Sequence, residues 1–372
     1  MPGKPLFVML PILALLLAGC TVDMSGQTFG TPPLPATPAP TVAAPGSGPV
    51  LPSTTIPVTW SGLDLGGRLV YLNGFEQDNN PYMRLQSLDL ANGVVTTLYQ
   101  TPPIGWIYAA AVSPDRTQIL LSYATPTNYP ALYLMPADGS SAPVLLFAPP
   151  TASDQYTQPG WSPDGKYIYF VHADYSLPPV EPNQHYPIFE IERMAVPGST
   201  PEVLLTKAYW PRLSADGSRL VYVSENPQDG TNQLFTAAAD GSSPQQVALT
   251  GPVVPTIIDA PLFLPDSQTI LFSAPVPAQS YVPNWLDWLL GVRAASAHSI
   301  PSEWWSVPAS GGAATQLTHI QSPGLYASLS PGGTQLASFS GNGVFVMQPD
   351  GSGLTMIVGD VGGIPGTVDW IP

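Results

Sequence analysis

The sequence predicts an all-β chain that folds as a six-bladed β-propeller behind a proline-rich tether. A turn-and-strand phrase returns along residues 60–372, a second tight turn alternates with it, and each recurs about every fifty residues. Four short strands in a repeat of roughly 40 to 50 residues are typical of a propeller blade. We therefore expect six four-stranded antiparallel blades.

The N-terminus predicts a lipoprotein signal peptide over residues 1–19. Lys4 precedes an apolar run from Leu6 to Leu17, which is short for a bilayer span. The only cysteine follows in Leu17-Ala18-Gly19-Cys20, which resembles the lipobox of bacterial lipoproteins. The resemblance implies lipidation of Cys20, a membrane anchor, and an extracytoplasmic location at the cell membrane or outer membrane. The alternative is an ordinary signal peptide with a chance cysteine.

Residues 20–58 predict a linker that holds the folded part away from the membrane. Nine of the 28 residues in 31–58 are proline, and no charged residue occurs from Met24 to Leu63. Such a segment cannot bury enough apolar surface to offset its ordering entropy, and it favours polyproline II. We place the propeller at residues 59–372.

The first repeated signal is Ser-Pro-Asp-Gly followed by alternating apolar residues, as in Ser162 to Val171. In this turn Pro presets φ, Ser and Asp bond nearby backbone, and Gly takes a positive φ. We interpret the repeated aspartates as structural. The copies centre on Asp115, Asp164, Asp216, Asp266 and Gly332, with a degenerate one at Gly66-Gly67.

The second signal is a hairpin turn of the Asn-Gly or Asp-Gly kind. Six copies predict six blades: Asn92-Gly93, Asp138-Gly139, Pro197-Gly198, Asp240-Gly241, Ser310-Gly311 and Asp350-Gly351. The C-terminal TVDWIP aligns with the start of a unit, and we expect it to complete the first blade. Residues 58–64 also resemble an inner strand, which leaves seven candidates for six places.

The phrases WSPDGKYIYF and LYLMPADG resemble the WD-related repeats of the TolB-like propeller family. The match is best at Ser162 to Gly165, and the first and last units depart from it at Gly66 and Gly332. The family includes periplasmic scaffolds and the substrate-gating domains of prolyl oligopeptidases. In those peptidases a separate hydrolase domain carries the chemistry, and residues 59–372 leave no room for one.

Composition and motifs argue against several function classes. Acidic residues outnumber basic ones 25 to 10 without a basic cluster, so we expect no nucleic-acid partner. No Gly-x-Ser-x-Gly elbow or phosphate-binding Gly-rich loop occurs, and we expect neither catalytic residues nor a cofactor. His172 and His185, near Asp174 and Glu181, could hold a metal, but solvated loop histidines are the preferred interpretation, and we expect no metal.

Two regions are candidates for binding. Aromatic and polar residues just before the innermost strands predict a ligand-binding rim, unless they fill space between blades. This rim comprises Tyr108, Gln158, Tyr209, Trp210, Asp259 and Tyr326. Within the long fifth unit, a short predicted helix places four apolar residues on one face for membrane or partner contact, unless it folds over the propeller's side. These are Trp285, Trp288, Leu289 and Val292.

The sequence thus predicts a non-catalytic envelope lipoprotein that binds a protein, peptide or glycan through the channel face. One alternative is a propeller hydrolase or lyase acting on envelope or environmental carbohydrate, which needs His, Asp or Glu converging on the channel. Another is an accessory sensor domain with a separately encoded signalling partner.

Overall fold

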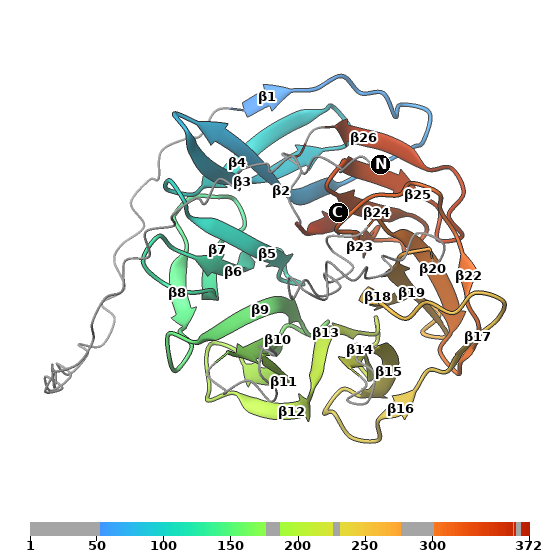
Figure 1. The fold of residues 1–372 in the computed structure, drawn as a ribbon. Coiled ribbons are helices and arrows are strands. Elements are labelled where there is room, and N and C mark those ends of the chain that lie inside the picture. The colour runs from blue at the N-terminus through green and yellow to red at the C-terminus, as the bar shows by residue number, and fades with distance from the viewer. Residues whose placement is uncertain (1–52, 176–186, 226–230, 277–300, 360, 362–365) are drawn as a thin grey trace, which may run out of the picture. The chain divides into compact units, whose positions relative to one another are not determined.

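The computed structural model describes residues 53–175, 187–225, 231–276, 301–359, 361 and 366–372. The chain divides into two units, Met1–Ala44 and Pro45–Pro372, and all described residues belong to the second. In the described part, strands form six antiparallel four-stranded blades around a centre, one of them extended by a fifth, outer strand (Figure 1), which confirms the predicted fold class. Among these residues, no helix is long and apolar enough to cross a bilayer.

Each blade is built from strands that follow one another in the chain, except that blade 1 takes its inner strand from the C-terminus and blade 5 omits β21 (Gly312–Ala313). From the centre outward, blade 1 is β27 (Val368–Ile371), β2 (Arg68–Gln77), β3 (Asn80–Asp89) and β4 (Val94–Gln100). Blade 2 is β5 (Trp106–Val112), β6 (Gln118–Ala124), β7 (Ala131–Pro136) and β8 (Val144–Phe147). Blade 3 is β9 (Asp154–Trp161), β10 (Tyr167–Asp174), β11 (Ile188–Ala195) and β12 (Glu202–Thr206).

The second half of the ring repeats this order. Blade 4 is β13 (Ala208–Leu213), β14 (Arg219–Glu225), β15 (Asn232–Ala238) and β16 (Gln245–Gln246). Blade 5 is β18 (Asp259–Phe263), β19 (Thr269–Ala274), β20 (Glu303–Pro308) and β22 (Thr315–Gln316). Blade 6 is β23 (Tyr326–Leu329), β24 (Leu336–Ser340), β25 (Gly343–Met347) and β26 (Thr355–Gly359). Outside the blades, β17 (Leu249–Thr250) pairs in parallel with β21 (Gly312–Ala313).

The repeated turn works as its residue types predict. Ser162 Oγ donates to Asp164 Oδ1 at 2.7 Å and accepts from the Tyr167 backbone N–H at 2.9 Å. Asp164 Oδ1 also accepts from the Lys166 backbone N–H at 3.1 Å, and Gly165 has a φ of 71°. The hydrogen bond from Ser162 is the first cause that lowers the pKa of Asp164 to about 2. Asp115 and Asp216 accept equivalent bonds within their own turns.

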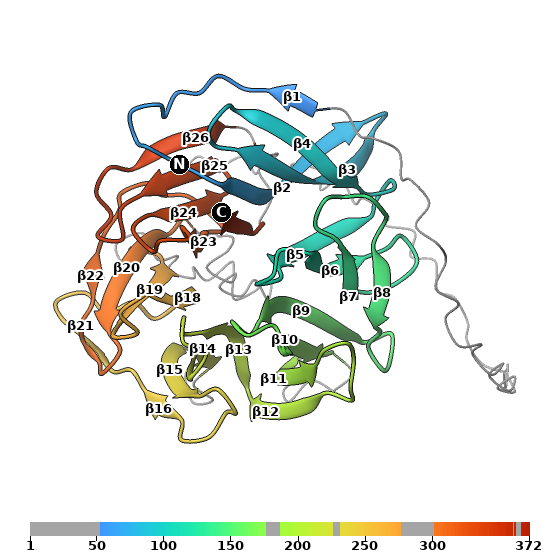
Figure 2. The same ribbon diagram turned by 180° about the vertical axis from the view of Figure 1, so that it is seen from behind.

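The ring closes through the C-terminus, as predicted. Val368–Ile371 pairs antiparallel with the start of β2, with Arg68 opposite Ile371 and Tyr71 opposite Val368. Both views of the ribbon place the C-terminal strand at the inner side of blade 1 (Figure 2). One blade therefore joins the two ends of the described chain.

The segment before β2 lies on the outer side of blade 1. β1 (Ser53–Thr55) pairs with β4, with Ser53 opposite Thr96, so this blade gains a fifth strand. Residues 56–66 form no strand, and Trp60 is buried with its indole N–H donating to Leu90 O at 2.8 Å. This resolves the surplus of inner-strand candidates, because 58–64 is an outer segment. Residues 53–58, assigned to the linker from the sequence, lie along the blade in the structure.

Apolar layers between neighbouring blades make the core. The layer between blades 2 and 3 contains Leu120, Leu132, Tyr156, Ile168 and Phe170. Each fully buried side chain of this size contributes about 1.5–3 kcal/mol through removal from water. Adjacent blades therefore hold one another, which leaves recognition to the two faces and the channel.

Candidate functional site: the channel mouth

We define the channel mouth as the face at which the innermost strands begin. The turns that carry the Ser and Asp pairs follow these strands, so they lie at the opposite face. The last residues of β10 and β14 and the first residues of β11 and β15 also lie at the mouth, because the strands of each blade are antiparallel. The predicted rim residues lie on the innermost strands near this face.

The rim residues differ in their access to solvent. Tyr108 is 45% exposed, and Gln158 and Tyr209 are half-buried. Trp210, Asp259 and Tyr326 are buried, with exposures of 8%, 2% and 5%. These three pack inside the channel, which is the arrangement expected of residues that fill space there. Contact with a ligand stays a prediction for the whole set.

β-Bulges in the innermost strands direct several of these side chains. The register shifts between Ile107 and Ala109 in blade 2 and between Tyr209 and Arg212 in blade 4. Gln158, Trp210 and Ala260 occupy the same position of their units and have positive φ values of 52°, 58° and 47°. Such bulges leave one residue unpaired and aim its side chain away from the regular alternation.

Hydrogen bonds then link one innermost strand to the next. The Trp210 backbone N–H donates to Gln158 Oε1 at 2.6 Å, which joins blades 3 and 4. The Trp210 indole N–H donates to Asp259 Oδ1 at 3.2 Å, which joins blades 4 and 5. The Trp210 ring centre lies 6.1 Å from that of Tyr326 in blade 6. Four of the predicted rim residues therefore form one connected cluster.

Two charged residues that sequence reasoning missed complete this interior. The Arg212 guanidinium lies 4.4 Å from the Tyr326 ring centre, and its Nη2 donates to Ala327 O at 3.4 Å. Asp369 Oδ2 accepts from the Val112 backbone N–H at 2.7 Å. Burial raises the pKa of Asp369 to about 6, opposed by the charge of Arg212. The available signal was a single arginine within the otherwise uncharged strand AYWPRL.

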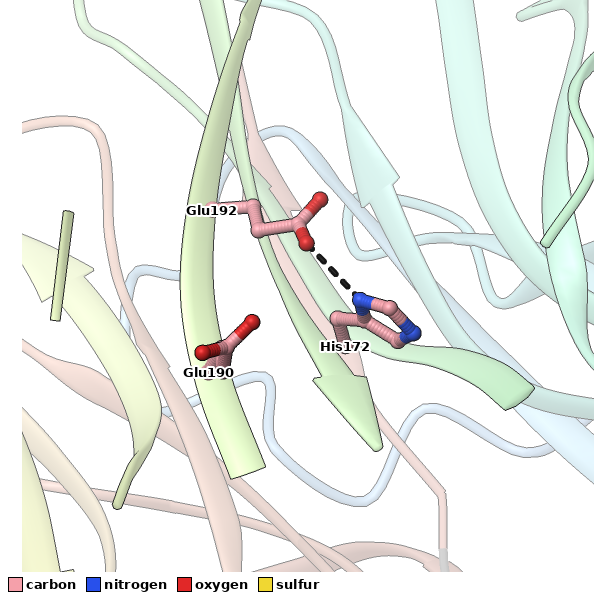
Figure 3. A group of neighbouring side chains, drawn as sticks. All are labelled: His172, Glu190 and Glu192. Carbon is pink, nitrogen blue, oxygen red and sulfur yellow. Dashed lines mark hydrogen bonds and ion pairs between the residues drawn. The ribbon is translucent and has the colours of Figure 1, made fainter. Parts of the chain in front are cut away.

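A second group of polar residues lies between blades 2 and 3, and we call it the His172 cluster: Asp154, His172, Glu190 and Glu192. His172 is opposite Glu190 in the register of β10 and β11, and Asp154 begins β9. Figure 3 shows Glu192 and His172 pointing toward each other, with Glu190 beside them on the same strand as Glu192. The hairpin of blade 3 thus brings one imidazole among carboxylates.

The imidazole is held on both sides. His172 Nδ1 lies 2.8 Å from Glu192 Oε1, and Nε2 lies 3.2 Å from Asp154 Oδ1. The hydrogen bond with Glu192 is the first cause that raises the pKa of His172 to about 9, while burial opposes it. Burial by itself would raise the pKa of Asp154, but hydrogen bonds from Thr151 and His172 outweigh burial, and the pKa is lowered. At neutral pH an imidazolium therefore separates two buried carboxylates.

This arrangement suits a bound proton better than a bound metal ion. His172, Glu190 and Glu192 each offer one possible ligand atom, all within 4.8 Å of one another. A metal needs a neutral imidazole with a free lone pair, whereas both His172 nitrogens here face carboxylates. Asp174 ends the same strand, and His185 and Glu181 lie outside the described residues. We assign no catalytic step to the His172 cluster.

The other sequence-predicted site residues lie outside the described part of the chain. These are the lipidation site Cys20 and the apolar face Trp285, Trp288, Leu289 and Val292.

Comparisons with known proteins agree on the fold. No family model and no curated protein matches the sequence. Among solved structures, a TolB protein of Agrobacterium tumefaciens superposes with a TM-score of 0.52 and 16% identity, over 82% of this chain and 99% of that one. TolB of Acinetobacter baumannii superposes with a TM-score of 0.54 and 17% identity, over 79% of this chain and 65% of that one. The chain thus spans less than two thirds of the length of that TolB protein.

A chain of a nidogen/laminin complex is similar to the same degree. Its TM-score is 0.54 at 12% identity, over 82% of this chain and 98% of that one. At such low identities the likeness bears on the fold alone. The chain has the six-bladed β-propeller fold, and its structural likeness is to TolB propellers.

Proposed function

We propose that this protein is a non-catalytic binding protein of the bacterial cell envelope, held to a membrane by lipid on Cys20, with a protein or peptide partner at the channel mouth. The observation that carries the proposal is the contrast between a packed interior and an exposed mouth. Trp210, Asp259 and Tyr326 fill the channel, while Tyr108 remains 45% exposed at its rim.

Two further points support binding over catalysis. Propellers with this fold include TolB and a chain of a nidogen/laminin complex, which is a complex between proteins. His172, whose strand ends at the mouth, is engaged by carboxylates on both sides, so it is poorly placed as a general base. A hydrolase or lyase that used this imidazole as its general base would need it free to take a proton.

Site-specific photo-crosslinking tests the binding site. A photoreactive residue replaces Tyr108 at the mouth or, as the control, Met356 on β26, which is 48% exposed on an outer strand. Crosslinking in intact cells is followed by detergent solubilisation and mass spectrometry of the captured proteins. We expect a specific protein at position 108 that is absent at 356. The same set of proteins at both positions, or none at 108, would contradict the proposal.

The anchor is tested separately. Cys20→Ser removes the acylated thiol, so we expect loss of fatty-acid labelling and release of the protein from the membrane fraction. Retention of the label in this variant would exclude Cys20 as the lipid attachment site.

A further inference from the structure

We propose that the mouth between blades 2 and 3 binds a lysine- or arginine-bearing, extended segment of the partner. This inference rests on the proposed function and specifies the chemistry of the partner. We call the surface the acidic seat: Tyr108, Tyr175 and Glu190, with Asp154 and Glu192 beneath them.

Two tyrosines flank the seat and are open to solvent. Tyr108 lies on the bulged strand β5 of blade 2 and is 45% exposed. Tyr175 directly follows β10 of blade 3 and is 49% exposed, and its backbone N–H donates to Ser153 O at 3.1 Å. Tyr108 lies on β5, which packs against β9 of blade 3, and Tyr175 follows β10 of that same blade. Burial raises the pKa of Tyr175, and Tyr108 adds to the effect. Aromatic faces of this kind attract ammonium and guanidinium groups.

Glu190 supplies a charge that lacks a counterion within the described residues. Its carboxylate lies within 4.8 Å of the ligand atoms of His172 and Glu192, yet it forms no ion pair with any residue that the structure describes. Asp154, Glu190 and Glu192 share one positive group, the imidazolium of His172. Three carboxylates and one imidazolium leave a net negative charge at this site, which attracts an incoming cation.

The charge of the whole face has the same sign. Described acidic residues near the mouth include Asp154, Asp174, Glu190, Glu192 and Glu225, and the described basic residue that ends a strand connection there is Lys207. The opposite face carries basic residues beside its turns, Arg68, Arg116, Lys166 and Arg219, but also acidic residues within them: Asp115, Asp138, Asp164, Asp216, Asp240, Asp266 and Asp350. The charge of the mouth is therefore compatible with a cationic partner, and the preference for this site over the opposite face comes from the local group of Asp154, Glu190 and Glu192 beside the two tyrosines.

A side chain suits the seat better than a free ion. Tyr175 follows Asp174, which is opposite Asp154 in the register of blade 3. Glu190 is opposite His172, two residues before Asp174 on β10. The ring faces and the carboxylates are therefore offset along blade 3. An extended segment spans about 3.3 Å per residue, so basic groups two or three residues apart reach both parts. Metal ligands would have to be carboxylates alone, because His172 is protonated.

The test uses the full-length protein in detergent and two defined probes. One is a short, capped and fluorescently labelled peptide of alternating glycine and lysine, and the other replaces lysine with glutamate. Anisotropy titrations at pH about 7 are run at about 50 mM and about 300 mM NaCl. We expect the lysine peptide to bind, binding to weaken at the higher salt, and the glutamate peptide not to bind.

Variants assign the binding to the seat. Glu190→Gln, and separately Tyr108→Ala with Tyr175→Ala, are each expected to weaken lysine-peptide binding at least about five-fold. Tyr108→Phe keeps the ring and is expected to retain binding. Met356→Ala is the control, because Met356 is 48% exposed on β26 of blade 6, away from the seat. Thermal unfolding of each variant checks that the fold persists.

Unchanged affinity in both Glu190→Gln and the double tyrosine variant would overturn the inference, as would equal binding of the two peptides. That failure is distinct from failure of the proposed function. A partner captured at position 108 that binds Glu190→Gln as well as it binds the parent protein would leave the binding function standing and remove the cationic seat.

Discussion

The guanidinium of Arg212 lies 4.4 Å from the ring centre of Tyr326, although Arg212 belongs to blade 4 and Tyr326 to blade 6. The contact passes the intervening blade and crosses the interior of the channel. The same arginine influences Asp369 in blade 1, whose pKa burial raises to about 6. One side chain of blade 4 therefore interacts with residues of blades 6 and 1 on the other side of the channel.

Arg212→Met is expected to lower the free energy of unfolding by about 1–2 kcal/mol, because it removes a cation–π contact and a hydrogen bond but keeps an apolar stem. Above the pKa of about 6 the loss is expected to be larger, since Asp369 is then charged and loses its favourable partner. Below that pH the carboxyl is neutral and the loss shrinks. Urea unfolding at pH about 7.5 and about 5 measures both. Arg116→Met, in an exposed turn, is the control, and equal losses for the two variants would contradict the role of Arg212.

His172 predicts a pH dependence of stability. Its pKa is raised from 6.5 to about 9 in the folded protein, so its contribution is fully present below pH 6.5 and is lost as the pH rises through about 9. His172→Gln cannot titrate and should lack this loss. The expected result is a difference in unfolding free energy between the two proteins that narrows over this window by about 2 kcal/mol. Urea midpoints measured at pH steps across it supply the check, and parallel curves would show that the imidazole is not charged in the native state.

Glu303 holds the segment that follows β22. It is 1% exposed; Oε2 accepts from Thr318 Oγ1 at 2.7 Å and from the Ile320 backbone N–H at 2.8 Å, and Oε1 accepts from the Gln321 backbone N–H at 2.8 Å. Glu303→Gln keeps the shape but turns an NH2 group toward a donor. We expect a loss of about 2–3 kcal/mol in chemical denaturation. Glu202→Gln, at an exposed ion pair, should change stability by at most about 1 kcal/mol. A neutral effect at position 303 would mean that the carboxylate is not required there.

Gly351 and Gly353 form a matched pair within one hairpin. Both have positive φ, 85° and 68°, so alanine strains the backbone at either position. Only at Gly351 would the added Cβ meet backbone, at 2.5 Å from Leu317 O, while Gly353 has open space around it. Gly353→Ala is expected to cost about 1 kcal/mol and Gly351→Ala at least about 2 kcal/mol more. Thermal unfolding distinguishes them, and equal shifts would show that the hairpin can move away from the loop of blade 5.

The turns and the number of blades were readable because they are local. Ser162, Asp164 and Gly165 make their bonds within a few residues, so residue type and spacing are enough to predict the structure. The same holds for the hairpin at Asp350-Gly351 and for the alternation of β10. Closure by the C-terminal strand could be predicted because the sequence ends with only the first strand of a further repeat. That strand can complete a blade only by pairing with the strands at the start of the propeller.

The candidate site was only partly readable. The sequence placed Tyr108, Gln158, Tyr209, Trp210, Asp259 and Tyr326 on the innermost strands, but it could not tell which of them are buried. Bulges at Gln158 and Trp210 break the two-residue alternation of buried and exposed side chains, and no residue type in the sequence predicts these bulges. His172 was considered with His185, whereas its described partners are Asp154 and Glu192, which join it through blade pairing.

The sequence by itself determined the repeated four-strand unit, the turns between strands and the closure of the ring, since each depends on neighbours along the chain. Only the tertiary structure decided that Arg212 reaches Tyr326, that His172 is enclosed by two carboxylates, and that residues 53–66 run outside blade 1. The physical reason is that these contacts join segments tens to hundreds of residues apart. Their geometry depends on how twisted, bulged sheets pack around a common centre, and the periodicity of the sequence does not specify that packing.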